Sequence, residues 1–292
     1  MKNNTHLKHL LELNIAMLFI STSGALGRYV ELPVPVIIGT RSLLALLFLL
    51  LYCKWKGIAL KVDKKHLFPV LISGVLIGAH WITYFYALKL SNVAIGMISI
   101  FTYPIITAFL EPILLKTKFQ KIHLLLALLV LLGIYFLVPS FSFENNYTIA
   151  VIFGVSSAVV YSLRNILLKT KVASYNGSML MCYQLAVVTI ALLPFLFTVE
   201  TASLISQWKG LIALALLTTA IGHTLFLNSF KNFSITTVSI LSSVQPVFGI
   251  IIAFLLLNEI PNKNTVIGGV LILSSVVIES IRSSKQESNN TK

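Results

Sequence analysis

Apolar residues run along this chain in long stretches that short polar segments separate. The hydrocarbon core of a bilayer is about 30 Å thick, so a helix needs about 20 apolar residues to cross it. Ten stretches of about that length can be placed, and because none shows sustained alternation they are predicted as helices rather than barrel strands. The predicted spans are residues 13–30, 35–53, 67–88, 92–115, 121–138, 148–169, 177–198, 209–229, 235–257 and 265–281.

Composition supports an all-α integral membrane protein. Hydrophobic residues make up 57% of the chain and charged residues 11%, whereas soluble domains are about 25% charged. Lipid must therefore cover much of the surface. The first span follows Lys2 and Lys8 and so also resembles a secretory signal peptide. Its full length and its counterpart later in the chain favour a helix of the mature protein.

The net charge of +13 is interpreted as a topology signal. Most Lys and Arg residues outside the ten spans fall on the side that holds both termini, which predicts cytoplasmic termini in the inner (plasma) membrane. Anionic lipid headgroups would attract the same residues, so no nucleic-acid partner is expected. The two cysteines, Cys53 and Cys182, do not suggest a disulfide or metal framework.

An internal repeat relates the two halves of the chain. Residues 101–118 read FTYPIITAFLEPILLKTK and residues 243–260 read SVQPVFGIIIAFLLLNEI, so Pro104 and Pro246 begin matching apolar runs. A polar and aromatic segment that starts with a histidine precedes each run. Five spans per half is an odd number, so the halves must be inserted with opposite orientation. Such inverted repeats are typical of secondary transporters, with the substrate site near the membrane midplane.

The predicted organisation has five parts. They are a cytoplasmic tail (1–12), a first five-helix repeat (13–138), an external linker (139–147), a second five-helix repeat (148–281) and a disordered cytoplasmic tail (282–292).

The chain resembles the EamA-like transporters of the drug/metabolite transporter superfamily. The resemblance rests on YALKLSNVAIGMISIFTYP (86–104), on LLLNEIPNKNTVIGGVLILSSVVI (255–278) with the acidic residue Glu259, and on Arg41 of the second span. It covers nearly the whole chain. The resemblance implies a bundle in which the third, fourth, eighth and ninth spans, with the first and sixth, enclose a central cavity. It also implies export or facilitated passage of amino acids, related metabolites or toxic organic compounds.

Aromatic and polar residues inside the spans are the candidate substrate-binding residues. His80, Trp81 and Tyr84 share one helical face, and His80 lies about 10 Å from the outer edge. An interfacial aromatic belt is the simpler interpretation of such rings, although this depth lies below the belt. The predicted substrate-binding residues are His80, Trp81, Tyr84, Tyr103, His223, Ser242 and Gln245.

Charged and amide residues inside the spans are the candidates for coupling or gating. Arg41 either meets a substrate carboxylate or donates to backbone carbonyls inside the bundle. Glu111 is the sole carboxylate well inside a span, so it could carry a coupling proton or form an ion pair near the inner end. The two differ by about 18 Å in depth, which argues against a direct pair. The predicted coupling or gating residues are Glu111, Arg41, Arg164 and Gln184.

Pro104 and Pro246 are predicted helix hinges, because a proline inside a span removes a backbone hydrogen bond and bends the helix. Kinks that serve packing alone are the other interpretation.

The sequence thus predicts a secondary transporter for small organic solutes that works by alternating access. A channel or a structural bundle is the alternative, for which a ring-like repeat is expected. A membrane enzyme would need a nucleophile with its base, paired carboxylates or a metal cluster. No catalytic residue, metal or cofactor is predicted, protons are the candidate coupling ion, and both a monomer and a homodimer remain open.

Overall fold

The computed structural model describes residues 2–116, 119–137, 142–169, 175–229, 231–232, 242 and 244–290. In this part of the chain every regular element is a helix. The first half forms α1 (Lys2–Tyr29), α2 (Val34–Trp55), α3 (Lys64–Leu90), α4 (Val93–Ile100), α5 (Tyr103–Leu115) and α6 (Ile122–Leu137). The second half forms α7 (Asn146–Lys169), α8 (Gly177–Leu192), the 3-10 helix η2 (Leu193–Thr198), α9 (Thr201–Ser206), α10 (Trp208–Ala213), the π-helix η3 (Leu214–His223), α11 (Thr224–Ser229), α13 (Gln245–Leu257) and α14 (Lys263–Asn290).

Helices occupy the positions that the apolar stretches predict, and the all-helical class is confirmed. Six helical segments in the described residues are long and apolar enough to cross a membrane, namely Val34–Trp55, Lys64–Leu90, Val93–Leu115, Asn146–Leu168, Gly177–Thr198 and Trp208–Ser229. Helices α6 and α13 are apolar but shorter. The ten-span architecture therefore stays a prediction. The predicted ninth span begins at residue 235, but residues 235–241 lie outside the described part.

The helices extend beyond both predicted ends of the membrane region. Helix α1 begins at Lys2, where a tail of residues 1–12 was expected, and α14 continues to Asn290, where a disordered tail from residue 282 was expected. The extension of α14 has a physical reason, since residues 282–290 contain neither proline nor glycine to end the helix. Of the expected external linker, residues 139–141 lie outside the described part.

The two matching prolines of the repeat lie at helix starts. Helix α4 ends at Ile100, and Pro104 lies in the first turn of α5. Pro246 likewise lies in the first turn of α13. Proline fits there because the first turn needs no amide hydrogen bond within the helix. The fourth span is interrupted just before Pro104. A hinge at Pro104 or Pro246 stays a prediction.

Helices α5 and α13 also end alike. Each is closed by a residue with left-handed backbone, Lys116 (φ 55°) after α5 and Asn258 (φ 55°) after α13. These two residues follow Pro104 and Pro246 at the same distance along the chain. The similarity of the two halves thus extends from sequence to local backbone structure.

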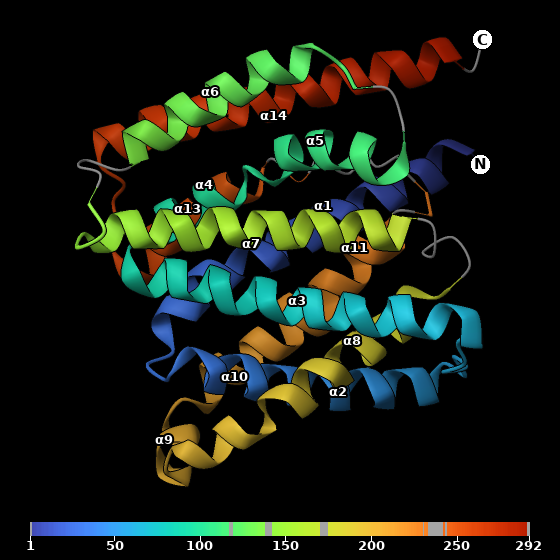
Figure 1. Ribbon diagram of the computed structural model, residues 1–292. Helices are drawn as coiled ribbons and strands as arrows, with labels where there is room; N and C mark the ends of the chain where they lie inside the picture. The colour runs from blue at the N-terminus through green and yellow to red at the C-terminus, as the bar shows by residue number, and fades with distance from the viewer. Residues whose placement is uncertain are drawn as a thin grey trace.

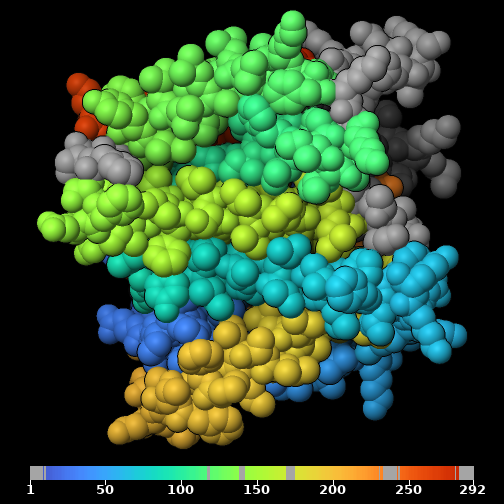
Figure 2. All heavy atoms as spheres, in the orientation of Figure 1, coloured from blue at the N-terminus to red at the C-terminus, as the bar shows by residue number. Residues whose placement is uncertain are grey.

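The helices form a bundle with their long axes roughly aligned (Figure 1). Helix α6 packs along α14, α3 along α7, and α2 along α8. The face in Figure 2 shows the green α6, the yellow-green α7 and the cyan α3, with the blue-green α5 between α6 and α7. Helix α1 begins and α14 ends at the same end of the bundle (Figure 1). Large apolar side chains such as Ile190 and Tyr135 are about three-quarters exposed on the outside, as lipid contact requires.

Corresponding helices of the two halves make corresponding contacts. The contact of α3 with α7 corresponds to that of η3 with α1, and the contact of α5 with α7 corresponds to that of α13 with α1. The contact of α3 with α8 corresponds in the same way to that of η3 with α2. The pairs α2 with α8 and α6 with α14 map onto themselves.

Candidate functional site

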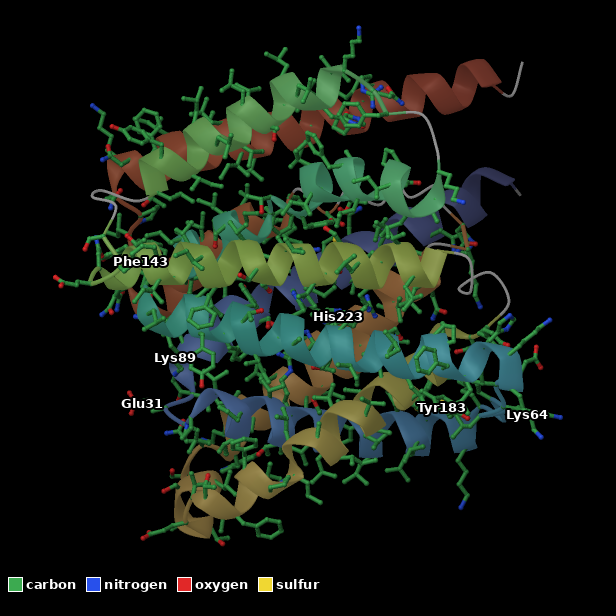
Figure 3. All side chains as sticks on the ribbon, viewed as in Figure 1. Glu31, Lys64, Lys89, Phe143, Tyr183 and His223 are labelled. Atoms are coloured by element: carbon green, nitrogen blue, oxygen red, sulfur yellow. The ribbon has the colours of Figure 1, made fainter. Side chains whose placement is uncertain are left out.

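Helix α3 brings two consecutive residues to different neighbours inside the bundle. His80 faces α7, where its ring stacks on Tyr161 at 4.5 Å between centroids. Trp81 faces η3 and α2, with its ring 5.4 Å from that of His223 and 4.5 Å from the guanidinium carbon of Arg41. Figure 3 shows His223 near mid-length of the bundle. The interior therefore holds two linked groups of polar and aromatic residues.

The first group holds the buried Arg41 side chain. Arg41 Nε and Nη2 donate to Thr219 Oγ1 at 3.0 and 2.8 Å, and Nη2 also donates to Thr218 Oγ1 at 3.3 Å. Both threonine hydroxyls donate their own proton to the Leu214 carbonyl, so their lone pairs are left to accept from Arg41. Arg41 Nη1 has no hydrogen-bond partner in the described structure.

The π-helix η3 positions the acceptors of Arg41. It carries Thr218, Thr219 and His223 on the buried side of its ten residues. π-Helical segments are rare and often occur at functional sites. His223 was predicted from the sequence, but the two threonines were not. Their signal was a polar Thr-Thr pair in an otherwise apolar span, one turn before that histidine.

The second group surrounds His80. The Ser157 hydroxyl lies 2.8 Å from both His80 Nδ1 and the His80 carbonyl oxygen. The Tyr84 ring is parallel to the imidazole at 6.2 Å, and the Tyr103 ring meets Tyr161 edge to face at 5.1 Å. His80, Tyr84 and Tyr103 are among the substrate-binding residues predicted from the sequence. Tyr161, which lies between His80 and Tyr103, was not predicted.

Arg164 and Gln184 form a buried pair beside the second group. Arg164 Nη2 donates to Gln184 Oε1 at 2.7 Å, and Nη1 donates to Asn165 Oδ1 at 3.2 Å. The guanidinium carbon lies 5.9 Å from the Tyr161 ring centroid. Both side chains are fully buried. Arg164 Nε and Gln184 Nε2 have no hydrogen-bond partner among the described residues.

The remaining predicted residues divide between the bundle interior and its edge. The Tyr103 hydroxyl is hydrogen-bonded to the Ser242 side chain. Gln245 Nε2 lies 2.9 Å from Met17 Sδ of α1. Glu111 lies on α5 and is partly buried. The described residues contain no cluster of three or more His, Cys, Asp or Glu side chains that could bind a metal ion.

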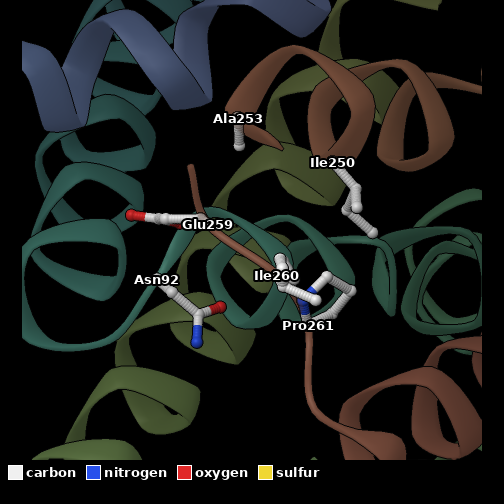
Figure 4. A pocket seen from close by; sticks show the side chains of 7 residues that line it. Asn92, Ile250, Ala253, Glu259, Ile260 and Pro261 are labelled. Carbon is white, nitrogen blue, oxygen red and sulfur yellow. The ribbon is translucent and has the colours of Figure 1, made fainter. Parts of the chain in front are cut away.

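Glu259 joins three helices at one end of the bundle. Its Oε1 accepts from Arg28 Nε at 3.0 Å, and its Oε2 accepts from the Val93 amide at the start of α4 at 2.8 Å. Arg28 Nη1 also donates to the Leu88 carbonyl near the end of α3 at 3.0 Å. A small pocket next to this contact is shown in Figure 4. It is lined by Asn92, Ala94, Ile250, Ala253, Glu259, Ile260 and Pro261.

Comparison with known proteins finds similarity over nearly the whole chain. The model of the EamA-like transporter family matches residues 9–138 and again residues 148–281. The pseudopaline exporter CntI of Pseudomonas aeruginosa is 25% identical over 248 residues, which cover 84% of this chain and 86% of the exporter. An uncharacterized transporter of Archaeoglobus fulgidus is 24% identical over 196 residues, which cover 67% of this chain and 70% of that protein. A solved crystal structure has a similar fold with a TM-score of 0.68 at 16% identity, covering 95% of this chain and 98% of the other.

Proposed function

Because the chain belongs to the EamA-like transporter family, we propose that it is a secondary transporter that exports or facilitates the passage of small organic solutes. Amino acids, related metabolites and toxic organic compounds are the proposed substrate classes. The observation that carries the proposal is the family match to both halves of the chain. Relatives that are named as exporter and transporter support it.

The proposed architecture is ten spans in two inverted five-helix repeats, residues 13–138 and 148–281. The two separate family matches support it. The corresponding contacts made by the helices of the two halves support it as well. Both termini are proposed to be cytoplasmic because Lys and Arg gather on that side of the ten-span arrangement.

The proposed mechanism is alternating access around a site in the middle of the bundle. His80, Trp81 and Tyr84 on α3, with His223 on η3, supply the aromatic and polar surfaces that would contact a solute. The helix starts at Pro104 and Pro246 would serve as hinges, because a proline in the first turn of a helix has no amide hydrogen bond to lose when the chain bends there.

Solute flux through proteoliposomes tests this proposal. A panel of labelled amino acids is to be run with and without an imposed pH gradient, against protein-free liposomes. We expect flux that saturates with solute concentration. Flux that depends on the imposed pH gradient would make Glu111, His80 and His223 the first candidates for proton carriers. Flux that is independent of the gradient would indicate a facilitator. Flux that rises linearly without saturation would favour a channel, and no flux above the protein-free control would contradict transport.

A substitution on α3 tests the site itself. We expect His80→Ala to lower flux while membrane insertion is retained, because it removes the ring that joins Tyr84 to Tyr161. His66→Ala is the matched control on the same helix, since His66 contacts Tyr175 at the end of the bundle. Equal flux in the two variants would show that His80 is not part of the substrate site.

A further inference from the structure

The two fully buried arginines of the bundle interior have neutral partners only. The described ion pairs join other residues, namely His9 to Glu12, Arg28 to Glu259, His66 to Asp63, and His123 and Arg282 to Glu279. In the described structure no carboxylate lies within 4.0 Å of Arg41 or Arg164. A buried charge without a counter-charge is unfavourable. The interior therefore carries positive charge that an anion could compensate.

The Arg164–Gln184 pair also has hydrogen-bond donors to spare. The contact with Arg164 orients the Gln184 amide, because its oxygen accepts from the guanidinium and the opposite orientation would set donor against donor. The Gln184 NH2 group therefore points away from Arg164 Nη2. It remains buried without a partner, as does Arg164 Nε. Unsatisfied buried donors are rare in proteins, so two in one pair need an explanation.

Aromatic surface adjoins this pair. The Tyr161 ring lies against the Arg164 guanidinium, and the His80 ring stacks on Tyr161. Arg41 lies over the Trp81 ring at 4.5 Å, and that ring lies 5.4 Å from the His223 ring. Each arginine donates from two of its nitrogens and keeps one without a partner. Arg164 differs in that its own partner, Gln184, also has a buried donor without a partner. Arg164 with Gln184 is therefore the better placed pair to accept an anion.

We propose that Arg164 and Gln184 bind the carboxylate of the transported solute. This inference rests on the proposed transport function and names the substrate class of the same site. A carboxylate is planar, carries one negative charge and accepts two hydrogen bonds side by side, which suits the free guanidinium and amide donors. The rings of Tyr161 and His80 pack against the rest of the solute. Arg41 adds positive charge to the same bundle interior.

A comparison of acids with their amides tests the substrate class. Each amino acid of the flux panel is paired with its own carboxamide, which keeps the side chain and loses the negative charge. We expect the acid to be transported with an apparent affinity about ten-fold higher or more, because a hydrogen bond to a charged group is lost in the amide. Saturable flux that is equal for acid and amide would overturn this inference and leave the transport function standing. No saturable flux for any solute would contradict the transport function itself.

A glutamine-to-glutamate exchange tests the pair directly. Gln184→Glu places a carboxylate beside Arg164 and so supplies the missing counter-charge from within the protein. We expect the variant to fold with unchanged or higher thermal stability, to lose acid transport about ten-fold or more, and to keep carboxamide transport within about three-fold. Gln120→Glu is the matched control, because Gln120 also accepts from an arginine, Arg282, but lies outside the two aromatic groups. Acid transport by Gln184→Glu at the level of Gln120→Glu would overturn the inference.

Discussion

Arg41 shows how one residue can place a permanent charge in an apolar run. Its position in IIGTRSLLALLFLLL is fully buried, and its guanidinium is held by hydroxyls from η3 and by the face of Trp81. Hydrogen bonds and ring contacts lower the cost of burying the charge but do not neutralise it. Of the two interpretations of Arg41, the structure therefore shows the contacts of a donor inside the bundle, while a role toward substrate stays a prediction.

The two threonines that hold Arg41 should differ in importance. Thr219→Val keeps the shape of the side chain but removes the acceptor of two guanidinium bonds, and we expect a loss of about 1.5–3 kcal/mol in stability. Thr218→Val removes one long contact of 3.3 Å, so its loss should be smaller. Thermal unfolding of both variants in detergent measures the difference. An equal loss would show that Thr219 is not the main support of Arg41.

At the scale of elements, Glu259 explains how the short helix α4 is anchored. Its carboxylate accepts from the first amide of α4 and pairs with Arg28 of α1, so one side chain connects two helices with the loop before α14. An acidic group at a helix N-terminus is favourable because it meets free amides and the positive end of the helix dipole. The resemblance to the family marked Glu259, but its partners could not be identified from the sequence.

Removing the Glu259 carboxylate should loosen this end of the bundle. We expect Glu259→Ala to lower stability by about 1–3 kcal/mol, and Glu259→Gln to lower it less because the amide oxygen can still accept from Val93. Thermal unfolding of the purified variants gives the comparison. Glu200→Ala is the control, since Glu200 is exposed and its side chain makes no cap bond to α9. A stability loss no larger than in Glu200→Ala would show that the Glu259 contacts contribute little.

At the scale of the whole molecule, the order of helices and their mutual contacts agree with two related halves. The family model matches the halves separately, and corresponding helices of the two halves make corresponding contacts. The direction of insertion, in contrast, depends on charge in the loops and is a prediction from the sequence alone.

Labelling of single cysteines in cells tests that orientation. In a background with Cys53→Ala and Cys182→Ala, the exposed positions 59 and 201 lie between predicted spans, and the ten-span arrangement places them on opposite sides of the membrane. We expect Thr201→Cys to react with a membrane-impermeant maleimide in intact cells, and Ala59→Cys to react only after permeabilisation. The reverse pattern would place the termini outside. Reaction of both residues in intact cells would contradict the ten-span arrangement.

The sequence by itself determined where the helices lie and to which family the chain belongs. Both follow from local information, because the length of an apolar run and the order of motifs are properties of the linear sequence. The boundaries were less well predicted. The polar extension of α14 to Asn290 has no apolar signal, and the prolines of the repeat begin helices where a kink was expected.

Only the tertiary structure decided which polar side chains meet. Ser157 contacts His80 across 77 positions of sequence, and Thr219 contacts Arg41 across 178. Such pairs depend on the face that each helix turns to its neighbour and on the local π-helical geometry of η3. These features arise from packing between distant segments, so no pattern within a single span encodes them. For the same reason Tyr161, Thr218 and Thr219 joined the candidate site only once the helices were assembled.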